Sequence, residues 1–133
     1  MSATDVRTRR DHAHAFLDAA MLIDTLDADT EIEHTSNLIG SLAVLAGIAA
    51  SDSISGFVLG IRSGGDNHAD ALKILKRASS AGEKHANHLR RLIDSKNDSQ
   101  YSALFLTDAR ARELLTAAQR LVDAMDERIR NPL

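Results

Sequence analysis

The sequence contains no cysteine and no tryptophan, and Pro132 is its single proline. Without cysteine the chain has no disulfide, no thiolate metal ligand and no cysteine nucleophile, which fits a reducing compartment. The first residues, Met1 to His14, are polar and lack an apolar segment, so they predict no signal peptide. We therefore expect a cytoplasmic protein.

Aromatic residues are also scarce, at 3% of the sequence. The apolar content of 44% is ordinary for a globular protein and comes mainly from Ala, Leu and Ile. A core of these residues suits close packing between helices better than a β-sandwich. The formal net charge of −3 does not indicate a strongly basic nucleic-acid-binding protein.

The chain of 133 residues has the length of one ordinary domain, and no linker divides it. Apolar residues recur at intervals of three and four, which predicts an all-α, up-and-down bundle of four to five helices. We treat residues 1–133 as one helical domain in which residues 1–10 form a flexible tail. The expected helices span about residues 11–26, 31–62, 68–79, 83–95 and 107–130.

The segment from Glu31 to Arg62 is predicted to be the long central helix. Glycines at positions 40, 47 and 56 each disfavour a helix by about 1 kcal/mol relative to alanine. Together with many Ala and Ser residues, they indicate that other helices approach closely on several sides. Its serines and Asp52 argue against a membrane span.

Both ends of this helix have sequence signals. Thr30 and Glu33 have the spacing of a capping box at its start. The glycines of Ser63-Gly64-Gly65 predict a stop at its end. At the other end of the chain, Thr107 is predicted to cap the last helix.

No metal-binding or nucleophile motif stands out. Glu31 and His34 form one Glu-x-x-His pair, whereas a carboxylate-bridged di-metal bundle needs two such pairs and two further glutamates. His85 and His88 share one helical face, which is more typical of a solvated surface. No serine lies in a strand-to-helix Gly-x-Ser-x-Gly elbow. The sequence predicts neither a metal nor another cofactor.

Four stretches occur in an order that resembles a known family. They are an amphipathic segment from Asp11 to Leu26, the small-residue segment SLAVLAGIAASDSISGFVLG, the segment DNHADALKILK, and HLRRLIDSKNDSQYS. This order resembles the HEPN family, the higher eukaryote and prokaryote nucleotide-binding domain, over roughly residues 11–127. The family is a helical up-and-down bundle that includes ribonucleases, toxins and nucleotide-binding partners of nucleotidyltransferases.

The resemblance implies a site near the end of the fourth helix, with one departure. HEPN ribonucleases use Arg, then His four to six residues later, whereas the matching stretch has Lys96 and Asn97, with Gln100 or Tyr101 at the His position. Lysine lacks the planar fork of arginine, and neither glutamine nor tyrosine titrates near neutral pH. The resemblance thus implies a degenerate ribonuclease motif whose candidate catalytic residues are Lys96, Asn97, Gln100 and Tyr101. Its ligand-binding residues are Lys96, Asn97, Tyr101 and Arg91.

Arg62 and His68 also have the spacing of the ribonuclease motif, but one helix too early. The alternative for this pair is an arginine at a helix end and a histidine that packs the following turn, and we favour that alternative.

Three functions follow from the resemblance. The first is binding of RNA, a nucleotide or a partner protein without efficient cleavage. The second is an active, metal-independent, toxin-like ribonuclease, and the third is a helical homodimer that serves only protein interaction. The family's site is shared between two protomers, so the resemblance implies a homodimer. It also implies a nucleotidyltransferase or antitoxin as a candidate partner, and no membrane partner. The apolar and small-residue surface of the central helix also favours pairing.

Overall fold

The computed structural model describes residues 2–26, 33–60, 68–78, 82–96 and 106–130, and this part of the chain contains five helices and no strand. The predicted all-α bundle is therefore confirmed. The helices are α1 (Ala3–Leu26), α2 (Thr35–Leu59), α3 (His68–Ala78), α4 (Gly82–Asp94) and α6 (Asp108–Arg130).

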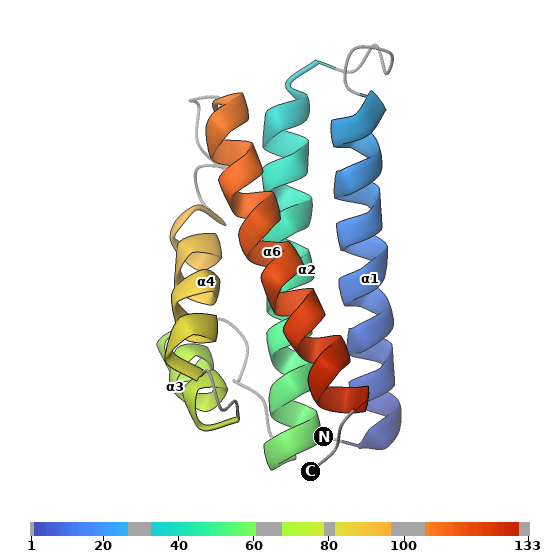
Figure 1. Ribbon diagram of the computed structural model, residues 1–133, viewed down its shortest axis with the longest axis vertical. Helices are drawn as coiled ribbons and strands as arrows, with labels where there is room; N and C mark the ends of the chain where they lie inside the picture. The colour runs from blue at the N-terminus through green and yellow to red at the C-terminus, as the bar shows by residue number, and fades with distance from the viewer. Residues whose placement is uncertain (1, 27–32, 61–67, 79–81, 97–105, 131–133) are drawn as a thin grey trace.

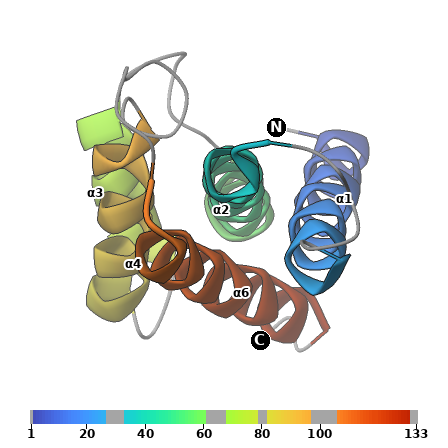
Figure 2. The ribbon, with the colours of Figure 1, turned by 90° about the horizontal axis from the view of Figure 1, so that it is seen from above.

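Helix α2 lies at the centre of the bundle, as the sequence predicts (Figures 1 and 2). Helix α1 packs along one side of it, α6 crosses a second side, and α3 and α4 lie on the side away from α1. The chain runs upward through α1 in Figure 1 and downward through both α2 and α6. Helices α2 and α6 therefore begin at the same end of the bundle, where α1 ends.

Small residues allow α2 to occupy this central position. Its buried residues are mostly Ala, Ser and Gly. At Gly47, an added Cβ would lie 2.3 Å from Cδ1 of Leu92 in α4 and 3.4 Å from Cδ1 of Leu121 in α6. Both leucines are fully buried. The glycine thus provides the space into which side chains of two neighbouring helices pack. This packing explains why a residue that disfavours a helix occurs at this position.

The length and composition of α2 would also allow it to cross a membrane. In the bundle, however, 61% of this apolar segment is buried against the rest of the protein. Such burial is typical of a core helix, which is hydrophobic on most of its faces.

Helix α1 begins at Ala3, so the expected flexible tail over residues 1–10 is wrong for residues 3–10. Ser2 and Asp5 form a reciprocal cap: the Asp5 N–H donates to Ser2 Oγ over 3.1 Å, and the Ser2 N–H donates to Asp5 Oδ2 over 3.0 Å. The next turn is held by α2, because Val6 is buried and its carbonyl accepts a hydrogen bond from Ser53. These contacts extend the helix through a segment whose polarity suggested a tail.

Helix α2 is shorter than predicted at both ends. It begins at Thr35 because His34 has left-handed backbone angles, with φ 58° and ψ 41°. Glu33 precedes the helix, so the capping box predicted from it is wrong. The helix ends at Leu59 because Gly60 adopts φ 71° and its N–H donates to the Gly56 carbonyl. Thr30, Arg62 and Ser63-Gly64-Gly65 lie outside the described residues.

The other helices begin and end close to their predicted bounds. The predicted cap of the last helix is confirmed, since the Arg110 N–H donates to Thr107 Oγ1 over 3.1 Å. Helix α6 then buries a stripe of apolar residues against α2 and α4.

We predict that Gly47→Val lowers the free energy of unfolding by roughly 1–3 kcal/mol, because the new side chain overlaps Leu92. Leu92→Ala alone should cost about 2–5 kcal/mol through the cavity it leaves. The double variant should lose less stability than the sum of the two single losses, because the added valine side chain fills part of the space that Leu92→Ala leaves. Urea unfolding followed by circular dichroism measures all three, and strict additivity would contradict the contact.

Candidate functional site

Only part of the predicted site lies within the described residues. Arg91 is exposed on α4, and Lys96 follows that helix and is half-buried. Asn97, Gln100 and Tyr101 lie outside the described residues, and so does Arg62. His68 begins α3, but the placement of its side chain is not described. Neither the Lys96–Tyr101 motif nor the Arg62–His68 pair is therefore assembled by the part of the chain that the structure describes.

Arg91 lines a groove of about 400 Å³ between α4 and α6, called the α4–α6 groove below. It is accompanied by His88 on α4, which lies one helical turn before Arg91 and hence on the same face. The remaining lining residues come from α6: Ala109, Arg112, Glu113, Thr116 and Ala117.

Buried residues of α4 and α6 turn these side chains toward solvent. Leu89 and Leu92 of α4 and Leu114 and Leu121 of α6 are fully buried in the core. Because they alternate with the polar positions at helical spacing, the opposite faces of both helices carry the charged residues. The sequence pattern therefore positions the groove as soon as the two helices pack.

Arg110 joins the start of α6 to the end of α4. Its guanidinium donates to the hydroxyl of the buried Ser95 just after α4, and also to Oε2 of Glu113 over 2.9 Å. Glu113 is the one carboxylate among the described residues that line the groove. Since Arg110 pairs with it, Arg91 and Arg112 have no other carboxylate beside them among the described lining residues.

His88 is the most informative residue of the groove. Its ring is half-buried, and within the described residues its Nε2 atom has neither solvent contact nor a hydrogen-bond partner. Burial lowers the pKa of His88 below the ordinary value of 6.5, and Arg91, His85, Arg120 and Lys84 lower it further. The imidazole is therefore neutral at neutral pH, and three basic residues, Arg91, Arg120 and Lys84, lie around it.

His85 lies one turn before His88 on α4. Burial also lowers the pKa of His85, with a contribution from Lys84, while Glu127 acts in the opposite direction. The carboxylate of Glu127 therefore acts on His85, and neither residue is among the described residues that line the groove. Three basic residues, Lys84, Arg91 and Arg120, act on His88, and a fourth, Arg112, lines the groove together with Arg91.

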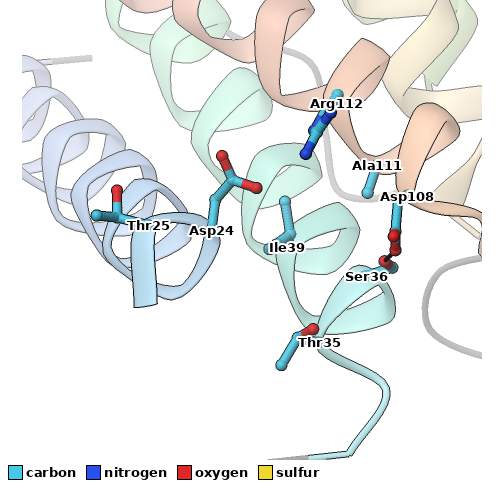
Figure 3. A pocket seen from close by; sticks show the side chains of 8 residues that line it. All are labelled: Asp24, Thr25, Thr35, Ser36, Ile39, Asp108, Ala111 and Arg112. Atoms are coloured by element: carbon cyan, nitrogen blue, oxygen red, sulfur yellow. Dashed lines mark hydrogen bonds between the residues drawn. The ribbon is translucent and has the colours of Figure 1, made fainter. Parts of the chain in front are cut away.

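A second cavity, of about 260 Å³, lies where α2 and α6 begin and α1 ends (Figure 3). In it, the Ser36 hydroxyl donates to Oδ1 of Asp108 over 2.6 Å. Asp108 opens α6, where a negative charge is favoured by the helix dipole. The lining residues are Asp24, Thr25, Thr35, Ser36, Ile39, Asp108, Ala111 and Arg112.

Sequence reasoning missed this second cavity and treated His88 as part of a solvated face. The residues of the cavity come from three helices that are far apart in the sequence, and each is an ordinary surface residue. The signal available for His88 was its spacing with Arg91, which places both on one face. Its burial depends on the approach of α6 and could not be read from α4 alone.

Metal-binding residues are not gathered in the described ranges. These residues contain no group of three or more His, Cys, Asp or Glu that could hold a metal ion. Of the single Glu-x-x-His pair, Glu31 lies outside the described residues, while His34 precedes α2 and lies 3.8 Å from the Glu33 carboxylate.

No protein-family model matches the chain, and no curated protein or solved structure is detectably similar to it. A functional assignment therefore depends on the chemistry of the α4–α6 groove and on the short motifs of the sequence.

The lowered pKa values of His85 and His88 predict that the protein loses stability in mild acid. Both groups bind a proton more weakly in the folded than in the unfolded protein. As the pH falls through 6.5, the unfolded chain takes up these protons first, so the free energy of unfolding decreases. Above that pH neither group contributes to the effect.

Urea unfolding between about pH 7.5 and about pH 5.5 tests this linkage. His88→Gln should reduce the acid-dependent loss of stability, because glutamine does not titrate. His12→Gln, at an exposed position of α1, should keep the loss shown by the parent protein. Equal acid sensitivity of the parent and His88→Gln would contradict the role assigned to His88.

Proposed function

We propose that the protein binds single-stranded RNA through the α4–α6 groove, as a HEPN-like protein that does not cleave RNA efficiently. The observation that carries the proposal is the surroundings of His88, where each titratable neighbour that shifts its pKa lowers it. A concentration of positive charge in a chain of net charge −3 is energetically costly without a ligand, and a polyanion offsets that cost.

The spread of the cations favours a ligand with several phosphates over a single anion. Lys84 and Arg91 are seven residues apart on α4, which corresponds to about 10 Å along the helix. Arg112 and Arg120 are about 12 Å apart on α6. Two rows of cations of this length can follow a nucleic-acid backbone.

The described residues that line the groove include no Phe, Tyr or Trp on which a base could stack. Affinity should therefore come mainly from phosphate contacts, which depend strongly on salt and weakly on base sequence. The proposal also places the groove next to the predicted motif, since α4 leads directly into Lys96 and the segment that the HEPN resemblance singles out.

His88 would respond to the bound RNA. A phosphate near the imidazole favours its protonated form, so binding raises the pKa of His88 from its lowered value. RNA binding is then coupled to proton uptake, and affinity increases as the pH falls below neutrality.

We predict that Arg91→Gln and Arg120→Gln each weaken RNA binding. For single strands, log Kobs falls with log salt concentration with a slope of about −0.7 per phosphate contact, so four contacts give about −2.8. Each variant should reduce this slope by about 0.7. Fluorescence anisotropy of a labelled oligouridylate, titrated at several salt concentrations, measures both affinity and slope.

Arg7→Gln is the matched control, since it removes the same charge from an exposed position of α1 on the far side of the bundle (Figure 2). It should bind like the parent protein. If the parent fails to bind the oligouridylate at low salt, or if Arg7→Gln weakens binding as much as Arg91→Gln, the groove is not the RNA-binding surface. Gel analysis of RNA recovered from the mixture distinguishes binding from the ribonuclease alternative.

We also propose that two copies of the chain pair through the outer leucines of α1 and α2. Leu22 and Leu26 of α1 and Leu38 and Leu45 of α2 are exposed, although α1 and α2 pack side by side. Leu38 and Leu45 are seven residues apart and thus share one helical face. In a dimer with a two-fold axis, this face of one copy packs against the same face of the other copy, so both copies bury the same apolar residues.

Leu45→Glu should dissociate this pair, because pairing would bury an uncompensated charge. Light scattering at micromolar concentration should give twice the mass of one chain for the parent protein and the mass of one chain for the variant. Met21→Glu, at an exposed residue about 100° around α1 from Leu22, should remain paired. A parent protein with the mass of one chain would contradict the proposed pairing.

A further inference from the structure

The second cavity contains two opposite charges that do not pair with one another. Figure 3 shows the carboxylate of Asp24 and the guanidinium of Arg112 pointing toward each other from α1 and α6. Within the described ranges, neither side chain forms a hydrogen bond or an ion pair. The space between them suits a ligand that carries both charges.

Two hydroxyl groups of the cavity already donate their protons within the protein. The Ser36 hydroxyl proton is donated to Asp108, and that of Thr25 is donated to the Met21 carbonyl over 2.9 Å. Both hydroxyl oxygens can therefore only accept further hydrogen bonds. With the carboxylates of Asp24 and Asp108, they form a set of acceptors, whereas Arg112 supplies a charged donor.

We propose that this cavity binds a free α-amino acid. The ammonium group donates to the Asp24 carboxylate and the Ser36 oxygen, and the carboxylate of the amino acid accepts two parallel hydrogen bonds from Arg112. The starts of α2 and α6, which carry partial positive charge, also favour the ligand carboxylate at this end of the bundle.

Ligands of a single charge fit the cavity less well. An inorganic anion held by Arg112 would face the carboxylates of Asp24 and Asp108, and a metal cation held by those carboxylates would face Arg112. A volume of about 260 Å³ is just below the usual range of roughly 300–1,000 Å³ for ligand pockets, which favours a molecule of amino-acid size. A zwitterion satisfies both charges within that space.

This site is separate from the proposed RNA-binding groove, except that Arg112 lines both cavities. Asp24 belongs to the second cavity alone, and Arg91 belongs to the groove alone. Variants at these two positions therefore report on the two proposals independently.

Isothermal titration calorimetry of the intact protein with each common L-amino acid tests the proposal. At least one should bind, and its N-acetyl and amide derivatives should bind on the order of tenfold or more weakly, since each lacks one charge. Absence of binding by every amino acid would overturn the proposal, as would derivatives that bind as tightly as the free amino acid.

Asp24→Asn and Arg112→Gln should each weaken binding of that amino acid by about tenfold or more, and Asp24→Glu should retain part of it. Asp18→Asn, at an exposed position of α1 outside the cavity, is the matched control and should bind normally. Circular dichroism should show that all variants are folded, because neither Asp24 nor Arg112 forms a hydrogen bond or an ion pair in the described residues. Unchanged binding by Asp24→Asn would overturn the assigned pose.

The two proposals can fail separately. Asp24→Asn should bind oligouridylate like the parent protein, while Arg91→Gln should bind the amino acid like the parent protein. Loss of RNA binding in Asp24→Asn would contradict the separation of the two sites.

Discussion

The close approach of three helices at Gly47 is the contact on which the arrangement of this protein depends. Because α2 has no side chain there, Leu92 of α4 and Leu121 of α6 pack against its backbone at the same level. The two leucines bring α4 and α6 beside each other on one side of α2. Their outward faces then form the α4–α6 groove, so the geometry of a charged surface follows from a missing side chain in the core.

The groove brings basic side chains of α4 and α6 together in a chain whose formal net charge is −3. Arg110 holds its end by contacting both Ser95 and Glu113, and it thereby occupies the carboxylate that would otherwise neutralise a neighbour. His88 remains neutral because burial and nearby cations lower its pKa. The proposed phosphate ligand would offset the repulsion among the basic residues around this imidazole. Arg112 lines both the groove and the second cavity, so the two proposed ligands would bind at neighbouring positions on α6.

The sequence predicts most of this fold, because helical spacing of apolar residues depends on local pattern alone. It identifies α2 as the central helix from its small residues, and Thr107 as the cap of α6. It fails where long-range contacts or unusual backbone angles determine where a helix begins. The start of α1 is held by the hydrogen bond from Ser53 to Val6, and α2 begins after His34, which adopts a left-handed conformation. Among the described residues that line the groove, the resemblance points to Arg91. The burial of His88 and the meeting of Asp24 with Arg112 could not be predicted from the sequence, since both require the packing of helices distant in sequence.

The claim that the α4–α6 groove is the functional surface can be tested directly by nuclear magnetic resonance. Isotope-labelled protein would be titrated with oligouridylate at low salt, and the backbone amide signals followed. The account predicts progressive shifts in the amides of residues 84–91 and 109–120, which reverse when salt is added. Shifts confined to α1 and the outer face of α2, or no shifts at low salt, would contradict it.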